Sequence, residues 1–325
     1  MKQQILFFYL VLSCSITFGQ KIHIVHDGIE TDSSFYHMAK INDNEYWVGG
    51  EYGILKKVDS SGNISHLDYP NDGLNILKII DVEEYIYIVT ANSVIYRYNT
   101  EDQTYLKKTF SNFKNKCFYD VISLQDGNLL VCGGTTGIQR ESKTIPKGFI
   151  AVLDKDLKEL DPVWKSYRKF VWSLLELPNG EVLASTFNGF NSKIIRSADH
   201  KEWKKDTKIK GLIHELALLD DEVYYSGAKS IRFKEDGIFG IIDREQKQLY
   251  GTGCLWSMDL VHGNVISVTS NNQLILFDKK NNELRQMDIP ISKAMYDIQK
   301  ISDSKIVVVG HAQSMYIIDL PEQPN

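Results

Sequence analysis

The chain has 325 residues, with 37 lysines and arginines against 42 aspartates and glutamates, and a formal net charge of -5. This acidic balance, together with the lack of any run of lysines or arginines, excludes nucleic acid as an expected partner. Three of the four cysteines, Cys117, Cys132 and Cys254, lie beyond the N-terminal region, and this odd number excludes a scaffold held together by disulfides.

The N-terminal segment, residues 1–20, has the composition of a secretory signal peptide, because Lys2 precedes an apolar run that gives way to small and polar residues. The alternative is a lipoprotein signal with a lipid anchor at Cys14. No later stretch is apolar over the length that a membrane helix needs, so we expect no transmembrane segment. The sequence therefore predicts an exported protein, periplasmic, secreted or at the cell surface, with residues 21–325 forming a single domain.

A four-residue pattern recurs along the chain. Its first residue is apolar, its second is usually aromatic, its third is polar and its fourth is aliphatic. The copies are Phe35–Met38, Ile76–Ile79, Phe118–Val121, Val171–Leu174, Ile213–Leu216, Leu255–Met258 and Met295–Ile298. Their second residues fall at positions 36, 77, 119, 172, 214, 256 and 296, so successive copies lie 40 to 53 residues apart. The chain thus contains seven repeat units.

Each unit continues with a polar turn and a second strand rich in β-branched and aromatic residues, as at 46–48 and 306–309. A third strand then ends in an aspartate or asparagine, at Asp59, Asn99, Asp154, Asp199, Asp243, Asp278 and Asp319. Such a side chain can accept a hydrogen bond from the backbone two residues on and so begin a turn. Four strands in about 40 to 45 residues, repeated radially, match a propeller blade. We predict an all-β fold, a seven-bladed β-propeller of four-stranded blades.

The last unit stops before its fourth strand, because residues 316–319 form its third strand and Pro321 follows. Residues 22–26 precede the first unit and have no strand partner within it. Closing the ring with this segment would remove two unpaired sheet edges. We therefore predict that residues 22–26 pair with residues 315–319.

The first unit carries a family resemblance. Residues 46–59, Y-W-V-G-G-E-Y-G-I-L-K-K-V-D, resemble the repeat of two-component-regulator propellers, and Gly73-Leu74-Asn75 approximates the motif that follows it in that family. The other units share only the hydrophobic pattern. The resemblance implies a propeller of the WD-repeat-like superfamily. Members of the family are usually sensor ectodomains joined to a membrane helix and a kinase, and we expect this chain to be a free-standing propeller.

A second resemblance lies at residues 197–203, S-A-D-H-K-E-W, which are similar to a shortened Asp-box of sialidase-like propellers. In that family the box is a structural hairpin at the edge of a blade, away from the catalytic pocket. The resemblance therefore implies a structural role for Asp199.

Ligands of propellers usually bind around the central channel, where the innermost strands begin and the loops between second and third strands lie. Candidate ligand-binding residues are Tyr36, Tyr119, Trp172, Trp256 and Tyr296 on the inner strands, and Tyr52, Phe187, Asn188, Phe190 and His311 in the loops. Amphipathic aromatic side chains among asparagines could stack on sugars or hold a peptide. The alternative is that these aromatics fill the space between neighbouring blades.

The third unit is the longest, with 53 residues before the next copy, and its extra residues are best placed at 137–148. Arg140 and Lys143, with Lys147, would make this loop a basic flap over the binding face. A tolerated surface insertion is the alternative.

Metal-binding and catalytic motifs are not evident. The sequence lacks H-x-x-x-H, C-x-x-C and calcium-loop spacings, so we expect no metal and no cofactor. It also lacks a nucleophile elbow and a phosphate-binding loop. The three cysteines are expected to be free and mostly buried, with Cys132 placed near Val121 by the hairpin turn at Asp126-Gly127.

These features favour a binding module whose channel face engages a protein, peptide or glycan without chemistry. The second hypothesis is a polysaccharide lyase or glycosidase, with proton transfer by candidates Tyr36, His37, His214, Glu215 and His311. In that reading Lys78 or Lys229 would neutralise a uronate carboxylate. The third hypothesis, from the regulator resemblance, is a periplasmic sensor or assembly subunit that works with a membrane partner.

Overall fold

The computed structural model describes residues 21–26, 32–113, 116–135, 147–230, 236–244, 246–289 and 293–320. The predictions for the signal peptide, Cys14, Arg140 and Lys143 lie outside these residues. In the part of the chain that is described, no helix is long and apolar enough to cross a membrane.

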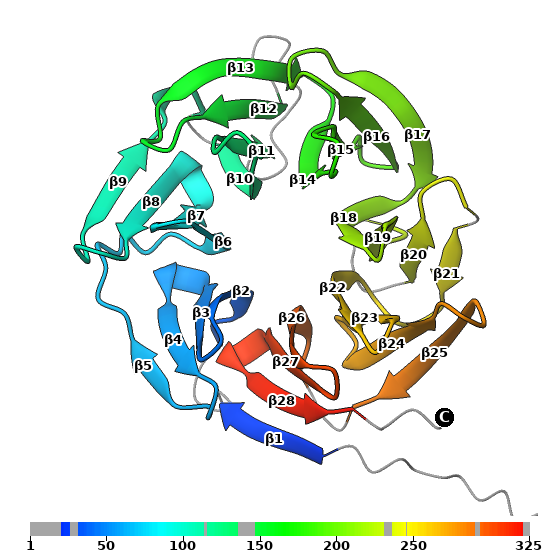
Figure 1. Cartoon of the computed structure of the whole chain (residues 1–325). Helices are drawn as coiled ribbons and strands as arrows, with labels where there is room; N and C mark the ends of the chain where they lie inside the picture. The colour runs from blue at the N-terminus through cyan, green and yellow to red at the C-terminus, as the bar shows by residue number, and fades with distance from the viewer. Residues whose placement is uncertain are drawn as a thin grey trace, which may run out of the picture.

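Seven four-stranded antiparallel sheets stand around a central channel, one for each repeat unit (Figure 1). From the channel outward, blades 1 to 4 consist of β2 (Phe35–Asn42), β3 (Glu45–Gly50), β4 (Leu55–Asp59) and β5 (Ile64–His66); β6 (Ile76–Val82), β7 (Tyr85–Thr90), β8 (Val94–Asn99) and β9 (Tyr105–Thr109); β10 (Lys116–Ser123), β11 (Leu129–Thr135), β12 (Gly148–Leu153) and β13 (Glu159–Ser166); β14 (Phe170–Glu176), β15 (Val182–Phe187), β16 (Asn191–Ser197) and β17 (Lys204–Lys210). Blades 5 to 7 consist of β18 (Leu212–Leu219), β19 (Glu222–Ala228), β20 (Gly237–Ile241) and β21 (Lys247–Leu249); β22 (Leu255–Val261), β23 (Asn264–Thr269), β24 (Gln273–Asp278) and β25 (Glu283–Asp288); β26 (Met295–Ser302), β27 (Lys305–Gly310), β28 (Met315–Asp319) and β1 (Lys21–His26). The described helical segments are the short 3₁₀ turns η1 (Glu51–Gly53), η2 (Ala91–Ser93), η3 (Ser111–Phe113) and η4 (His311–Gln313). The predicted fold class is confirmed.

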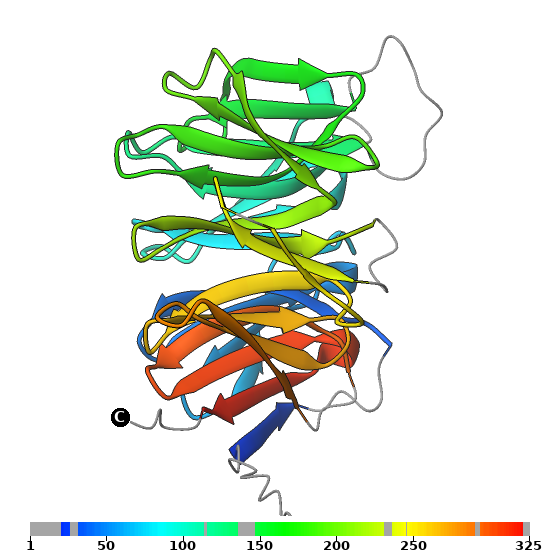
Figure 2. The ribbon, with the colours of Figure 1, turned by 90° about the vertical axis from the view of Figure 1, so that its right-hand side faces the viewer.

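The N-terminal strand closes the ring. Strand β1 pairs antiparallel with β28, with Ile22 opposite Ile318 and Ile24 opposite Tyr316, and it lies at the outer edge of blade 7 in both ribbon views (Figures 1 and 2). The predicted pairing of residues 22–26 with residues 315–319 is confirmed. Blade 7 is therefore built from both ends of the propeller, which joins the two ends of the ring by backbone hydrogen bonds.

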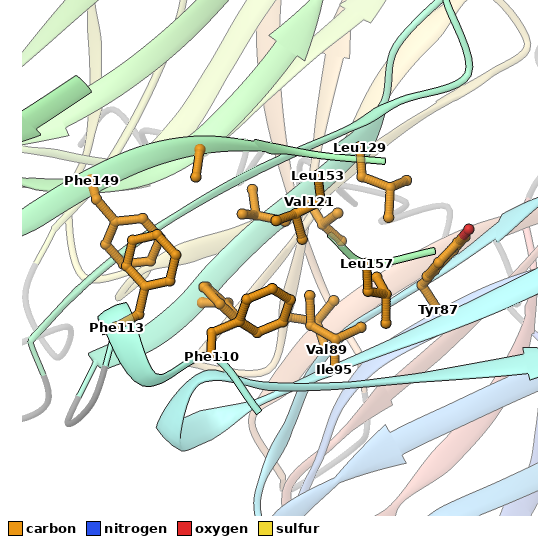
Figure 3. Close-up of a cluster of buried hydrophobic side chains, with 13 residues drawn as sticks. Tyr87, Val89, Ile95, Phe110, Phe113, Val121, Leu129, Phe149, Leu153 and Leu157 are labelled. Carbon is orange, nitrogen blue, oxygen red and sulfur yellow. The ribbon is translucent and has the colours of Figure 1, made fainter. Parts of the chain in front are cut away.

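Apolar side chains fill the space between neighbouring blades. Between blades 2 and 3, for example, Phe113 stacks on Phe149 with ring centroids 4.2 Å apart, and Phe110 and Phe118 pack against them (Figure 3). Each blade packs on both of its faces, so the middle strands are apolar on both sides, and all seven residues of β11 are buried. Hydrophobic burial between blades is thus the main stabilising interaction of the ring.

The aspartate or asparagine at or just after the end of the third strand accepts turn hydrogen bonds in blades 1 to 4 and in blade 6, as predicted for these units. The Asp59 carboxylate accepts a 2.9 Å hydrogen bond from the Ser61 amide, and Asp154 accepts a 3.0 Å bond from the Asp156 amide. The Asp-box residue Asp199 accepts bonds from two backbone amides, at 2.9 and 2.8 Å. These bonds lower the pKa of Asp199 to about 2, which agrees with a structural role.

Cys117, Cys132 and Cys254 are free and buried, as predicted. Cys132 pairs with Asp120, however, and Val121 pairs with Val131. The predicted register is one residue off because the hairpin loop has three residues ending in Gly127, whose φ is +82°, rather than two.

Candidate functional site at the mouth of the channel

Every innermost strand carries a β-bulge near its start, at the second residue of the repeat pattern. The residues that the strand pairing skips are Tyr36, Leu77, Tyr119, Trp172, His214, Trp256 and Tyr296. A bulge leaves one residue outside the hydrogen-bonded ladder and re-aims its side chain. All seven skipped side chains line the channel cavity. The recurring second residue of the repeat pattern is therefore the bulged residue.

The neighbouring strand approaches the bulge closely. Gly50 lies opposite Phe35, and a Cβ added to it would lie 2.0 Å from the carbonyl oxygen of Ser34. Gly310 meets the same restriction in blade 7, where the nearest atom is the carbonyl oxygen of Ala294 at 2.0 Å. The equivalent positions are glycine in four blades and threonine in three. A small or β-branched residue at this position accompanies the bulge in every blade.

Six of the bulged side chains form an aromatic girdle around the channel, in the order Tyr119, Trp172, His214, Trp256, Tyr296, Tyr36. Consecutive ring centroids are 4.5, 5.4, 4.3, 5.3 and 5.7 Å apart. Leu77 of blade 2 is the non-aromatic one among the seven bulged residues. Such contacts stabilise by about 0.5–1.5 kcal/mol each beyond area burial. The girdle therefore joins adjacent blades as well as lining the channel.

The residues after the bulge form a polar girdle that lines the same cavity: His37, Lys78, Asp120, Ser173, Glu215, Ser257 and Asp297. Several of these side chains accept a hydrogen bond from a backbone amide of the next blade. Asp120 accepts from Leu174 at 2.8 Å, and Ser173 accepts from Leu216 at 3.1 Å. His37 Nδ1 accepts from the Ile79 amide at 3.3 Å. The polar girdle is thus a set of inter-blade clamps.

The ionisation of the girdles follows from burial. Burial lowers the pKa of His214 to about 3, and its Nδ1 donates to the Trp256 carbonyl at 3.2 Å. Burial and Lys78 lower the pKa of His37 well below its usual range. Burial also raises the pKa of Asp297 to about 6 and that of Glu215 well above its usual range. These shifts favour the neutral forms of His37, His214 and Glu215. The Lys78 ammonium lies 3.5 Å from Asp120 in the same lining.

Two candidate proton-transfer residues lie at the mouth. Tyr36 donates a 2.6 Å hydrogen bond to Glu51, and burial together with this carboxylate raises the pKa of Tyr36 above its usual range. His311 lies 3.2 Å from the Ser34 hydroxyl. The cavity bounded by the two girdles has a volume of about 80 Å³, room for a few water molecules. Among the described residues, no group of three or more His, Cys, Asp or Glu side chains could hold a metal ion.

The mouth face, on which the inner strands begin, carries exposed aromatic side chains. Tyr52 and Phe190 are 68% and 80% exposed. Tyr167 and Tyr250, which the sequence analysis missed, are 48% and 76% exposed on the connections into β14 and β22. Within the described ranges, every tyrosine and phenylalanine that is largely exposed lies on this face. In the sequence, each of these exposed aromatic residues lies either just before the inner strand of a blade or just after its second strand.

One loop prediction needs correction. Phe187 is a residue of β15 and is 3% exposed, so it packs inside blade 4 instead of facing a ligand. The loop begins one residue later, because β15 continues pairing up to Phe187 opposite Ser192. Asn188 is exposed, but its side chain accepts hydrogen bonds from the Phe190 and Asn191 amides at 3.1 and 3.0 Å, which shapes the turn that presents Phe190.

Comparison with known proteins identifies the fold. No family model and no curated protein matches the chain. Among solved structures, virginiamycin B lyase from Staphylococcus aureus is similar with a TM-score of 0.71 at 11% identity, covering 93% of this chain and 100% of that one. YCF48 bound to D1 peptide is similar with a TM-score of 0.65 at 12% identity, covering 94% and 96%.

A bacterial sensor ectodomain is also similar. The extracellular domain of a one-component system from B. thetaiotaomicron matches with a TM-score of 0.65 at 17% identity, covering 94% of this chain and 43% of that one. WD40 propellers are among the other similar structures. At these identities the comparisons establish the fold, a seven-bladed β-propeller related in architecture to WD40 and two-component-system propellers.

Proposed function

We propose that this protein is an interaction module that binds a polypeptide segment on its mouth face. The observation that carries the proposal is the concentration of exposed tyrosine and phenylalanine side chains on this one face, around the mouth of the channel. Exposed aromatic residues are the commonest anchors of protein interfaces. Because the cavity between the girdles has a volume of about 80 Å³, it is too small for a polypeptide segment, and a partner would lie across the mouth.

Similar structures support this reading. One of them is bound to a peptide, and another is the extracellular domain of a signalling system. Export of this chain, expected from residues 1–20, is part of the proposal, as is a partner in the cell envelope. Proton-transfer chemistry is less favoured, because general acid–base catalysis works best with a pKa near the operating pH. The pKa values of Tyr36 and His214 are shifted away from that range.

The test is selection from a random peptide library displayed on phage, with the purified protein as the target. The mouth variant combines Tyr52→Asn, Phe190→Ala and Tyr250→Ala. Asparagine is chosen at position 52 because Tyr52 has φ +55°, and Asn92 occupies the equivalent position of blade 2 with φ +60°. Selected peptides should bind this variant at least about ten-fold more weakly than the wild type, since hot-spot side chains are removed.

The matched control removes three exposed apolar side chains from outer strands, with Ile24→Ala, Leu106→Ala and Leu160→Ala. It should bind the selected peptides like the wild type. Peptides that bind the mouth variant and the wild type equally would contradict the proposal. If no peptide were recovered, and the wild type bound a glycan array while the mouth variant did not, the mouth face would be a sugar-binding surface instead.

A further inference from the structure

Blades 3 and 4 carry a cluster of cations on the mouth face of the ring. A set of basic residues, here called the basic sector, lies at the mouth ends of their strands and connections: Lys116, Lys165, Arg168, Lys169, Lys193 and Lys208. The turns on the opposite face of the same blades are mixed in charge, because they carry both aspartates and lysines: Asp126, Asp154, Asp156 and Asp199 with Lys155, Lys158 and Lys201.

The cations of the basic sector lie close enough to repel one another. Lys193 pairs directly with Lys208 across β16 and β17. Burial together with Lys193 and Lys205 lowers the pKa of Lys169. Burial together with Lys165 lowers the pKa of Lys116, which is 4% exposed.

Their charges are not neutralised within the described residues. No ion pair within the described ranges involves the six cations of the basic sector. The Lys116 ammonium lies over the rings of Phe113 and Phe149, at 5.5 and 5.4 Å, which stabilises the cation without cancelling it. In a chain with a net charge of -5, this sector is a local region of positive potential.

Exposed aromatic side chains lie within the same sector. Tyr167 stands between Lys165 and Arg168 in the connection from β13 to β14, and Phe190 immediately precedes β16, which carries Lys193. Cations beside exposed apolar rings match a ligand with both carboxylates and apolar side chains. Five of the six cations are lysines, whose compact ammonium groups suit separate carboxylates better than planar, bidentate partners.

We propose that the basic sector binds an acidic segment of a polypeptide partner. This inference rests on the proposed function and specifies its partner: carboxylates of the segment lie against Lys165, Lys169 and Lys193, and its apolar side chains contact Tyr167 and Phe190. Binding is held by attraction between the carboxylates and the lysines, and it relieves the repulsion among the lysines. Because salt screens these charges, affinity falls steeply as salt is added.

The probe is a fluorescein-labelled peptide of repeated Glu-Leu-Gly units, titrated by fluorescence anisotropy at low ionic strength. The test variant is Lys165→Glu/Lys169→Glu/Lys193→Glu, and it should weaken binding by about ten-fold or more. The matched control, Lys155→Glu/Lys158→Glu/Lys201→Glu, reverses three exposed lysines on the opposite face and changes net charge equally. It should bind like the wild type, and circular dichroism melts check that both variants fold.

Equal weakening in both variants would overturn the inference, because it would reflect net charge alone. If the wild type did not bind the peptide, the inference would be overturned in favour of no anionic ligand. If oligogalacturonate bound more tightly to the same lysines, it would be overturned in favour of a uronate chain. The phage selection separates this result from the proposed function. The selected peptides could lack acidic residues, bind the charge-reversed variant normally and still depend on the mouth face. That result would support the proposed function and contradict the acidic partner.

Discussion

The backbone amide of Met38 donates a 2.7 Å hydrogen bond to Asp297 Oδ2, across the junction between blades 7 and 1. The other oxygen of the same carboxylate accepts from the Ile298 amide at 2.9 Å. This clamp joins the first and last inner strands of the ring, and equivalent clamps join blade 3 to blade 4 and blade 4 to blade 5. The polar residue of each repeat therefore has a structural role as well as a place in the channel lining.

Removal of this clamp should destabilise the ring. Asp297→Ala leaves the buried Met38 and Ile298 amides without a side-chain acceptor, a loss of about 2–3 kcal/mol. Asp297→Asn keeps one acceptor oxygen and should lose less. Urea unfolding of both variants measures the difference. If the alanine variant were as stable as the wild type, the clamp would not contribute to stability.

The ionisation of Asp297 should make stability depend on pH. Its pKa is raised by burial to about 6, above the value of 3.8 in an unfolded chain, so the folded state binds more protons between these values. Stability should therefore fall as pH rises from about 4 to about 6, by an amount on the order of 2–3 kcal/mol from this group. In Asp297→Asn this part of the decrease should be missing. Unfolding free energies of both proteins across this range make the comparison, and identical slopes would contradict the assignment.

Ring closure offers a matched pair of substitutions on one strand. Ile22 packs against the apolar cluster at the end of the ring, whereas Ile24 is 65% exposed. Ile22→Asp should destabilise by about 2–3 kcal/mol, because it removes an apolar contact and places a charge beside the core. Ile24→Asp should change stability by less than about 0.5 kcal/mol. Thermal melts compare the two, and equal effects would count against closure by β1.

The repeat could be predicted from the sequence because its inner strands share one hydrophobic pattern and one spacing. The unpaired segment 22–26 and the incomplete last unit then predicted the closure. The bulge could not be predicted, because a skipped residue such as Tyr36 leaves the pattern of apolar and polar residues unchanged. The clamp role of Asp297 was missed for a similar reason, since the donor to its carboxylate, the Met38 amide, is backbone and carries no sequence signal.

The basic sector was also missed. Its residues are separated in the sequence, from Lys116 to Lys208, and no run of basic residues marks them. The ring brings together strand ends from two blades, so the cluster exists only in three dimensions. The sequence did indicate a basic character for this region through Arg140 and Lys143, and that prediction stays untested because both residues lie outside the described ranges.

Substitution of a channel aromatic residue and of an exposed loop aromatic residue should have different effects on stability and on binding. Trp172 contacts Tyr119 and His214 on either side, so Trp172→Ala removes two ring contacts and should destabilise the protein by about 2–4 kcal/mol. Phe190 is exposed on its loop, and Phe190→Ala should leave stability within about 0.5 kcal/mol of the wild type while weakening binding of a mouth-selected peptide. Thermal melts and peptide titrations on the two variants make the measurement. A stable Trp172→Ala variant that loses binding would instead place the ligand inside the aromatic girdle, with its contacts to Trp172 rather than to the loops.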